Sequence, residues 1–219
     1  MTTTLDAPIL YNFRRCPYAM RARLALLSAE ITVDVREIVL RDKPAHMLEL
    51  SPKGTVPVLW VGNRVIDESR DIMDWALAQN DPEGLLDMPS EGEDWIATIE
   101  GPFKTALDRY KYATRYEGAD PQRERTIARD VLMTVDAQLR DTPWLFGGKP
   151  CLADLATITF VRQFANVDRA WFDDQPWDGV LSWLNRFLSS ARFETMMHKF
   201  SVWSDGDTPV FWPETRPKP

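Results

Sequence analysis

The first eighty residues alternate between strand-like and helix-like hydrophobic patterns. An apolar run at residues 9–13 predicts a strand, and a stripe at i, i+4 and i+7 predicts a helix that begins at about Pro17. The stripe consists of Met20, Leu24 and Leu27. Residues 32–38 are rich in β-branched side chains and predict a second strand. Such alternation is typical of an α/β layer.

The same pattern continues to residue 80. Residues 45–50 predict a short helix, and the apolar runs 56–61 and 64–66 predict a hairpin through Gly62-Asn63. Ser69 can act as the N-cap of a further helix that ends near Asn80. Residues 1–80 therefore predict one α/β domain.

Beyond a turn-rich linker at residues 81–92, every periodic segment is helical. One stripe runs from Trp95 to Tyr110, with an expected bend at Gly101-Pro102. Three more stripes are Ile127, Val131, Val135 and Leu139; residues 152–164; and Val180, Leu181, Leu184, Phe187 and Leu188. We therefore expect an all-α domain over residues 93–203. The tail, residues 204–219, contains four prolines and no periodicity, so it is either disordered or lies across a surface.

Composition narrows the class of protein. The chain has 219 residues, 44% of them hydrophobic, and a net charge of -7. The acidic balance argues against a nucleic-acid partner, because binding to phosphates needs clustered Lys and Arg. No run reaches the ~20 apolar residues of a membrane span, and the first residues lack the pattern of a signal peptide. We therefore expect a cytoplasmic protein that has no membrane partner.

The chain contains two cysteines, Cys16 and Cys151, and two histidines, His46 and His198. The cysteines are far apart in sequence and show no Cys-x-x-Cys spacing, which excludes a disulfide framework. A structural zinc site needs four closely spaced nitrogen or sulfur ligands, so we expect no metal.

Cys16 is the candidate reactive residue. It lies where the first strand gives way to a helix, and Pro17 suits the first helical turn. The helix N-terminus and four arginines favour the thiolate and would lower the pKa of this thiol below the free value of about 8.5. The arginines are Arg14, Arg15, Arg21 and Arg23. Most single cysteines are buried apolar residues, but the adjacent Arg14 and Arg15 are not typical of an apolar interior.

Three other positions have a structural and a functional interpretation. Pro57 within a strand-like run indicates an edge strand, or a cis bond that turns the backbone of Val56 outward. The helix start at Glu68-Ser69 is an N-cap and can also receive a ligand carboxylate. Lys43 by itself reads as an exposed loop lysine.

Together these motifs resemble the cytosolic glutathione transferases, and most closely the cysteine-type, omega-like members. The motifs are Cys16-Pro17-Tyr18-Ala19, the segment Ser51 to Leu59 (SPKGTVPVL), and Asp67-Glu68-Ser69, followed by the all-α half. The resemblance covers nearly the whole chain. It implies the glutathione transferase fold, which is an α/β thioredoxin-like N-terminal domain with the order β-α-β-α-β-β-α plus an all-α C-terminal domain. It also implies that the protein is a homodimer.

The resemblance also implies a role for particular residues. Cys16 is similar to the residue that forms a mixed disulfide with glutathione, the co-substrate. Val56, ahead of a cis Pro57, resembles the residue whose backbone pairs with the cysteinyl part. Glu68 and Ser69 resemble the residues that bind the γ-glutamyl group, and Lys43 with Leu40 resembles the residues that contact the glycyl end.

A further similarity lies at Gly148-Lys149-Pro150-Cys151-Leu152-Ala153-Asp154, which matches the family's capping box in the helical domain. Cys151 stands where the family usually has Ser or Thr. Because sulfur is a weak hydrogen-bond acceptor, this departure weakens the expected cap. Asp154 is then a folding residue, and the capping position already explains Cys151.

The expected activity is thiol transfer or reductive deglutathionylation. Ala19 occupies the second position of a dithiol motif, so a second glutathione must resolve the mixed disulfide in a monothiol mechanism. The alternatives are conjugation of glutathione to electrophiles, with Tyr11 and Tyr18 as nearby hydroxyls, and a non-catalytic binding or regulatory module. We expect a small-molecule second substrate in a cleft between the domains. Aromatic side chains are candidate walls, although core packing explains any one of them better: Tyr18, Phe103, Tyr110, Tyr116, Trp171 and Phe172.

Overall fold

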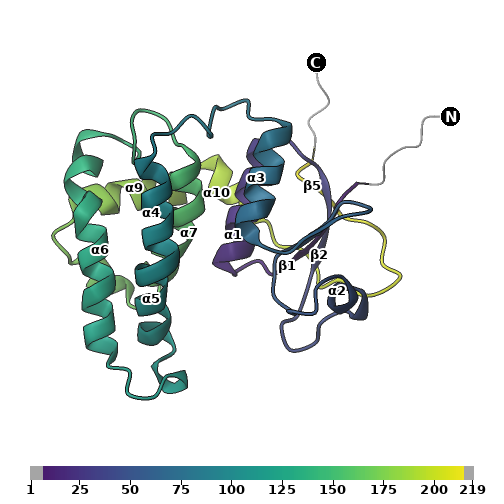
Figure 1. The fold of residues 1–219 in the computed structure, drawn as a ribbon, viewed down its shortest axis with the longest axis horizontal. Coiled ribbons are helices and arrows are strands. Elements are labelled where there is room, and N and C mark those ends of the chain that lie inside the picture. Colours follow the sequence, from purple (N-terminus) through teal and green to yellow (C-terminus); the bar gives the residue numbers. More distant parts are fainter. Residues whose placement is uncertain (1–6, 215–219) are drawn as a thin grey trace. The chain divides into compact units, whose positions relative to one another are not determined.

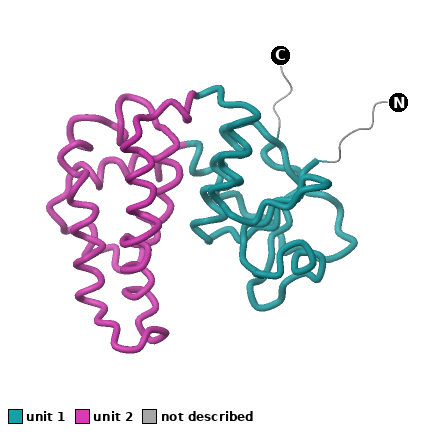
Figure 2. Tube along the Cα trace, in the orientation of Figure 1, with its two compact units in different colours: residues 1–83, 191–219 teal, residues 84–190 magenta. Residues whose placement is uncertain are grey.

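The computed structural model describes residues 7–214, which form two compact units (Figure 2). The first unit joins the chain up to Glu83 to the segment that begins at Ala191, and the second unit is Gly84–Ser190. This division differs from the predicted one, in which the all-α domain continued to residue 203. Residues 1–6 of the predicted first domain and residues 215–219 of the predicted tail lie outside the described part of the chain.

The first unit contains a mixed five-stranded sheet with the order β4-β3-β1-β2-β5 (Figure 1). Its strands are β1 (Ile9–Asn12), β2 (Val33–Glu37), β3 (Val58–Trp60), β4 (Val65–Ile66) and β5 (Phe211–Trp212). The pair β1–β2 is parallel and every other neighbouring pair is antiparallel. The predicted hairpin of β3 and β4 is present, and its turn contains Gly62 at a φ of 80°, a conformation that favours glycine.

Helices α1 (Pro17–Ser28) and α3 (Ser69–Gln79) cover one face of this sheet, and α2 (Ala45–Leu50) lies on the other (Figure 1). Successive side chains of a strand point to opposite faces. Tyr11 of β1 accordingly packs in a cluster with Met47 of α2. The order β-α-β-α-β-β-α and the thioredoxin-like fold class are confirmed.

The C-terminal segment completes the first unit. Helix α10 (Ala191–Met196) packs against α1, and β5 pairs with β2. Trp203 donates its N–H to the carbonyl of Glu37 at 2.8 Å, so residues 202–212 follow the outer side of β2. An edge strand leaves a row of backbone groups without strand partners, and this segment satisfies them. Of the two predicted alternatives for the tail, residues 204–214 take the second and lie across a surface.

The second unit is helical, as predicted. Its elements are α4 (Glu91–Thr98), a π-helical segment (Ile99–Phe103), α5 (Lys104–Lys111), a 3-10 turn (Ala113–Arg115), α6 (Pro121–Asp141), α7 (Leu152–Ala165), α8 (Arg169–Asp173) and α9 (Asp178–Leu188). The expected bend at Gly101-Pro102 is a π-helical segment, because Pro102 has no N–H for the regular helical hydrogen bond. Among residues 7–214, no helix combines the length and apolarity that crossing a membrane requires.

The predicted apolar stripe of α6 does not face the core. Ile127 is 38% exposed and Val131 and Val135 are only half-buried, whereas the polar Glu124 and Asp136 are buried. The buried Asp136 accepts the N–H groups of Gly179 and Val180 at 2.9 and 3.1 Å, at the start of α9. The face that is buried instead consists of Glu124, Ala128, Leu132, Asp136 and Leu139, and the Glu124 carboxylate on it accepts a hydrogen bond from Arg109. Of the predicted stripe, Leu139 alone is fully buried.

Asp154 joins three parts of the second unit. Its carboxylate accepts hydrogen bonds from the N–H of Leu145 at 3.0 Å, the N–H of Cys151 at 3.0 Å and the indole of Trp183 at 2.8 Å. The reciprocal capping box with Cys151 is formed in spite of the sulfur. Burial raises the pKa of the Asp154 carboxyl, and it also raises the pKa of the Cys151 thiol to about 12.

Most of the aromatic residues predicted as candidate walls of a cleft contribute to the core of the second unit. Phe103 and Phe172 are fully buried and pack edge-on against Phe164, with ring centroids 5.5 and 6.0 Å from it. Tyr110 and Trp171 also pack against Phe164. Core packing therefore accounts for Phe103 and Phe172.

Candidate functional site

Cys16 is the N-cap residue of α1, and its side chain is partly exposed. Its N–H donates to the carbonyl of Phe13 at 3.0 Å, which closes the turn between β1 and α1, and Pro17 occupies the first helical turn. The Cys16 Sγ lies 3.7 Å from the carbonyl oxygen of Val56, to which the thiol donates. The sulfur is therefore at the positive end of a helix and beside the loop that precedes β3.

A pocket of about 720 Å³ opens beside this sulfur. All seven residues predicted for the site line it, and the structure brings them together from four separate parts of the first unit. The lining residues are Cys16, Tyr18, Leu40, Lys43, Lys53, Gly54, Thr55, Val56, Pro57, Asp67, Glu68 and Ser69.

The bond between Val56 and Pro57 is cis. The edge-strand interpretation of Pro57 is wrong, because β3 lies inside the sheet between β4 and β1. Pro57 instead stands immediately before the strand, where its missing N–H removes no hydrogen bond from the ladder.

Ser69 is not the N-cap of α3. The helix begins with Ser69 as its first residue and Glu68 as its N-cap, because the N–H of Ile72 bonds to the Glu68 carbonyl at 3.0 Å. The Ser69 side chain is buried, and its Oγ accepts a hydrogen bond from Arg21 Nε at 2.9 Å. This hydroxyl is thereby fixed from α1, and Arg21 also lies over the ring of Tyr18.

Lys53 also lines the pocket, a position that no local sequence pattern predicted. Its ammonium donates to Glu68 at 2.7 Å and to Asp67 at 3.2 Å, and Asp67 also accepts the hydroxyl of Ser51 at 2.7 Å. The hydrogen bond from Ser51, assisted by Lys53, lowers the pKa of the Asp67 carboxyl. The predicted hairpin could have indicated this contact, because it brings Lys53, which precedes β3, close to Asp67 and Glu68, which follow β4.

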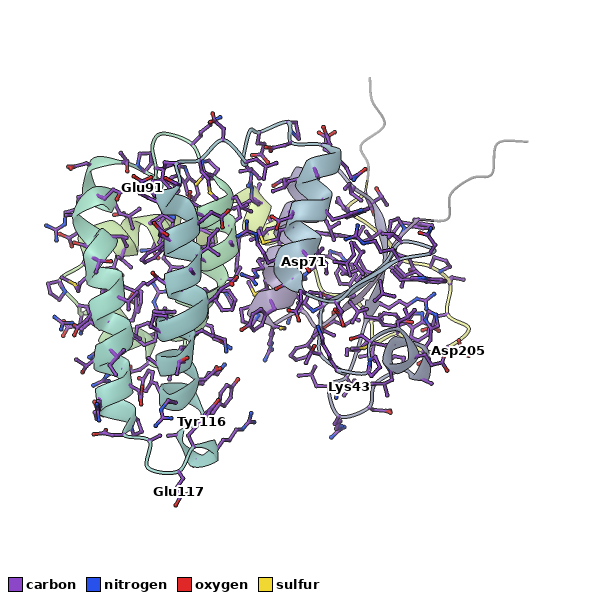
Figure 3. The ribbon with its side chains drawn as sticks, in the orientation of Figure 1. Lys43, Asp71, Glu91, Tyr116, Glu117 and Asp205 are labelled. Atoms are coloured by element: carbon purple, nitrogen blue, oxygen red, sulfur yellow. The ribbon has the colours of Figure 1, made fainter. Side chains whose placement is uncertain are left out.

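Leu40 and Lys43 lie on the loop between β2 and α2. Figure 3 labels Lys43 on this loop. Leu40 is 45% exposed and Lys43 is half-buried. A Cβ at Gly54 would meet the Lys43 side chain at 3.6 Å, so the lysine stem passes close to the loop before β3. Gly54 has a φ of 63°, which allows this turn without strain.

Three of the arginines around Cys16 in the sequence have different environments. Arg15 is exposed, and Arg21 is bound to Ser69. Arg23 is fully buried and interacts electrostatically with Cys16. A buried positive charge is poorly screened by solvent and salt, so Arg23 favours the thiolate more than an exposed arginine does.

We expect Cys16 to be alkylated as a thiolate at neutral pH. In the Cys151→Ser variant, the rate of reaction with iodoacetamide should rise with pH at a midpoint below the value of about 8.5 for a free cysteine. The helix N-terminus and Arg23 provide the physical reason. A midpoint at or above that of a free thiol would contradict the activation of this sulfur. Burial keeps Cys151 protonated and therefore unreactive over the same pH range.

Comparison with known proteins agrees with this geometry. The family model described as "Glutathione S-transferase, N-terminal domain" matches residues 10–84, and "Glutathione S-transferase, C-terminal domain" matches residues 93–186. Among curated proteins, "Glutathione S-transferase DHAR3, chloroplastic" of Arabidopsis thaliana is 27% identical over 142 residues, which are 64% of this chain and 52% of that protein. "Glutathione S-transferase DHAR2" of the same plant is 32% identical over 92 residues, 42% of this chain and 43% of that protein. The chain thus spans about half the length of these relatives.

Two solved structures share the fold. Glutathione transferase Omega 3C from Trametes versicolor superposes with a TM-score of 0.75 at 19% identity, covering 90% of each chain. A glutathione transferase family member from Pseudomonas fluorescens, with two glutathione bound, has a TM-score of 0.73 at 18% identity and covers 90% of this chain and 94% of that one. Because both family models match in the expected order and span most of the described residues, this chain belongs to the glutathione S-transferase family.

Proposed function

We propose that the protein is a glutathione-dependent thiol transferase or reductase that acts through a mixed disulfide at Cys16. The position of Cys16 carries this proposal. Its side chain is partly exposed at the start of α1 and lines the pocket of about 720 Å³. The family and the relatives with DHAR in their names support glutathione as the co-substrate.

The pocket offers partners for each part of glutathione. The backbone of Val56, whose carbonyl already faces Cys16, would pair with the cysteinyl residue. Glu68 and the N-terminus of α3 at Ser69 would hold the amine and carboxylate of the γ-glutamyl group. Lys43 would bind the glycyl carboxylate, with Leu40 as an apolar neighbour. Lys53 neutralises the acidic pair Asp67 and Glu68, which would otherwise repel an anionic ligand.

The proposed reaction has two exchange steps. The Cys16 thiolate attacks the glutathionyl sulfur of a glutathionylated substrate, the old disulfide breaks, and the substrate sulfur leaves as a thiolate. The thiolate of free glutathione then attacks the glutathionyl sulfur on Cys16, which releases oxidised glutathione and regenerates the Cys16 thiolate. The proton lost by glutathione is taken up by the released substrate thiol, and two electrons pass from glutathione thiols to the substrate disulfide.

The chain favours this monothiol route over an internal dithiol. Ala19 stands at the second position of the motif, and Cys151 is buried, with a pKa raised to about 12 by burial and by Asp154. A thiol with that pKa is almost entirely protonated near neutral pH and resolves disulfides slowly.

Conjugation of glutathione to electrophiles is the second candidate. Tyr18 lines the pocket and has Arg21 over its ring, so a hydroxyl is present in the site. Tyr11 is fully buried, with its hydroxyl bound to His46 and Arg36, which removes it as a candidate. A binding or regulatory module on the same fold would use the pocket without turnover, and it would have no need for an activated Cys16.

We further propose that the protein is cytoplasmic, where glutathione is reduced, that it acts on a small-molecule second substrate, and that it forms a homodimer. The partly exposed apolar stripe of α6, residues Ile127, Val131 and Val135, supports the dimer because it provides apolar surface for a second copy.

Intact mass spectrometry tests the proposed function directly. Incubation with oxidised glutathione should add one glutathione to the wild-type chain, and dithiothreitol should remove it. The Cys16→Ala variant should gain none, while Cys151→Ser should behave as the wild type. An adduct that persists in Cys16→Ala, or no adduct on a folded wild-type chain, would refute Cys16 as the nucleophile.

A further inference from the structure

Two buried side chains of opposite charge hold the backbone just before Cys16. The Arg14 N–H donates to Glu37 Oε1 at 2.7 Å, and the Arg14 carbonyl accepts from the Arg23 guanidinium at 2.6 Å. Glu37 lies at the end of β2, and Arg23 lies in the second turn of α1. One peptide segment is therefore bound on its donor side by an anion and on its acceptor side by a cation.

Both side chains are committed to backbone or to neighbouring buried groups. Arg23 also donates to the carbonyl of Met196 at 2.7 Å and to that of Ala19 at 3.3 Å. The second carboxylate oxygen of Glu37 accepts the amide of Asn12. Burial raises the pKa of the Glu37 carboxyl and lowers the pKa of Arg23 to about 10, so each buried charge is held at an energetic cost.

We propose that Glu37 and Arg23 are positioning residues that fix the Cys16 sulfur against the pocket. Because the Cys16 N–H is itself bonded to the Phe13 carbonyl, the turn from Phe13 to Cys16 has its backbone held at three points. Neither Glu37 nor Arg23 lines the pocket, so both act through the turn. This inference rests on the proposed function for its catalytic consequence, but its effect on the thiol itself does not depend on that function.

We call the pair Glu37 and Arg23 the clamp. The C-terminal segment contacts both of its residues. The Glu37 carbonyl accepts a hydrogen bond from the backbone N–H of Trp203, and the Met196 carbonyl at the end of α10 accepts one from the Arg23 guanidinium. The chain beyond residue 190 thereby braces a turn that lies more than 170 positions earlier in sequence. This segment belongs to the first unit, as does the turn.

The two charges also balance each other near the sulfur. Arg23 interacts electrostatically with both Glu37 and Cys16, and the carboxylate offsets part of the positive potential that the sulfur experiences. Removing the Glu37 charge should therefore stabilise the thiolate further, whereas removing its hydrogen bonds should release the turn. The loss of the charge should change the pH midpoint of Cys16 alkylation, whereas the loss of the hydrogen bonds should change kcat.

The test compares four variants of the full chain. Glu37→Ala removes both the charge and the hydrogen bonds. Glu37→Gln removes the charge and can keep both bonds, because Asn12 Oδ1 has no hydrogen-bond partner among the described residues and a flip of the Asn12 amide would present it to the new donor. Arg23→Lys keeps the charge but loses the planar fork that reaches several carbonyls. Asp34→Asn is the matched control, since Asp34 is also a buried β2 carboxylate but binds the N–H of Val210 and not the turn.

Two quantities are measured on each variant, namely the pH midpoint of Cys16 alkylation by iodoacetamide and the kcat for reduction of a glutathionylated peptide. Glu37→Gln should lower the midpoint and keep kcat within about threefold of wild type, whereas Glu37→Ala and Arg23→Lys should reduce kcat by about tenfold or more, because small displacements of a reacting group are costly. Asp34→Asn should change neither quantity.

The outcomes distinguish this inference from the proposed function. A folded Glu37→Ala variant with the kcat and the alkylation midpoint of the wild type would overturn the inference. If that variant does not fold, two results together would overturn it: a wild-type kcat in Arg23→Lys and a wild-type alkylation midpoint in Glu37→Gln. A wild-type chain without peptide reductase activity would refute the function, while the alkylation midpoints would still report on the clamp. A change in unfolding midpoint alone, with both reactivity measurements unchanged, would assign the pair a purely structural role.

Discussion

Replacement of Cys16 by alanine should abolish thiol transfer while glutathione binding persists. The proposed reaction passes through a covalent bond to this sulfur, so its loss removes the pathway and should lower kcat/KM by at least about 10³-fold. Glutathione binding should remain within a few-fold of wild type, because the other lining residues supply its contacts. Turnover with a glutathionylated peptide measures the first quantity, and isothermal titration calorimetry measures the second.

The matched control is Cys151→Ser, which removes the other thiol of the chain. This variant should keep full turnover because Cys151 is buried within the capping box of α7. Wild-type turnover in Cys16→Ala would disprove the assignment of the nucleophile. Retained turnover with an electrophilic conjugation substrate, together with lost thiol transfer, would instead support Tyr18 and the second candidate function.

Asp154→Ala should strongly destabilise the folded chain. The substitution leaves three buried N–H donors without their acceptor, namely the N–H groups of Leu145 and Cys151 and the indole of Trp183, and it also removes the acceptor of the Cys151 thiol. Each unsatisfied buried donor costs on the order of 1 kcal/mol, so the free energy of unfolding should fall by about 3 kcal/mol. Chemical denaturation followed by tryptophan fluorescence measures this change, and a denaturation midpoint equal to that of the wild type would contradict it.

Asp154→Asn separates the hydrogen bonds from the charge. The asparagine Oδ1 can still accept from Leu145 and Trp183, so the loss should be smaller than in the alanine variant. Burial raises the pKa of the Asp154 carboxyl in the folded chain above its unfolded value. The stabilisation associated with its protonated form is complete below the unfolded pKa and is lost as pH rises through the folded pKa. The wild type should therefore gain stability relative to Asp154→Asn as the pH falls through that range.

Much of the candidate site could be predicted from local sequence signals. Cys16-Pro17 stands at the junction of a strand and a helix, and chain direction alone places that residue at the helix N-terminus. The hairpin after Val56-Pro57 and the helix start at Glu68 are equally local, since turn residues and hydrophobic periodicity mark them. Lys53 was missed because its partners, Asp67 and Glu68, become neighbours only when the hairpin closes.

The sequence alone determined the order of the elements, the α/β and all-α halves and the place of the candidate nucleophile Cys16 at a helix start, because periodicity, capping and turn chemistry act between near neighbours. Only the tertiary structure decided that Asp136 and Glu124 face inward on α6, that Arg21 holds Ser69, and that the C-terminal segment completes the sheet. It also decided that Glu37 and Arg23 meet at the backbone of Arg14. Each of these contacts joins groups that are distant along the chain, and such pairings depend on how whole elements pack.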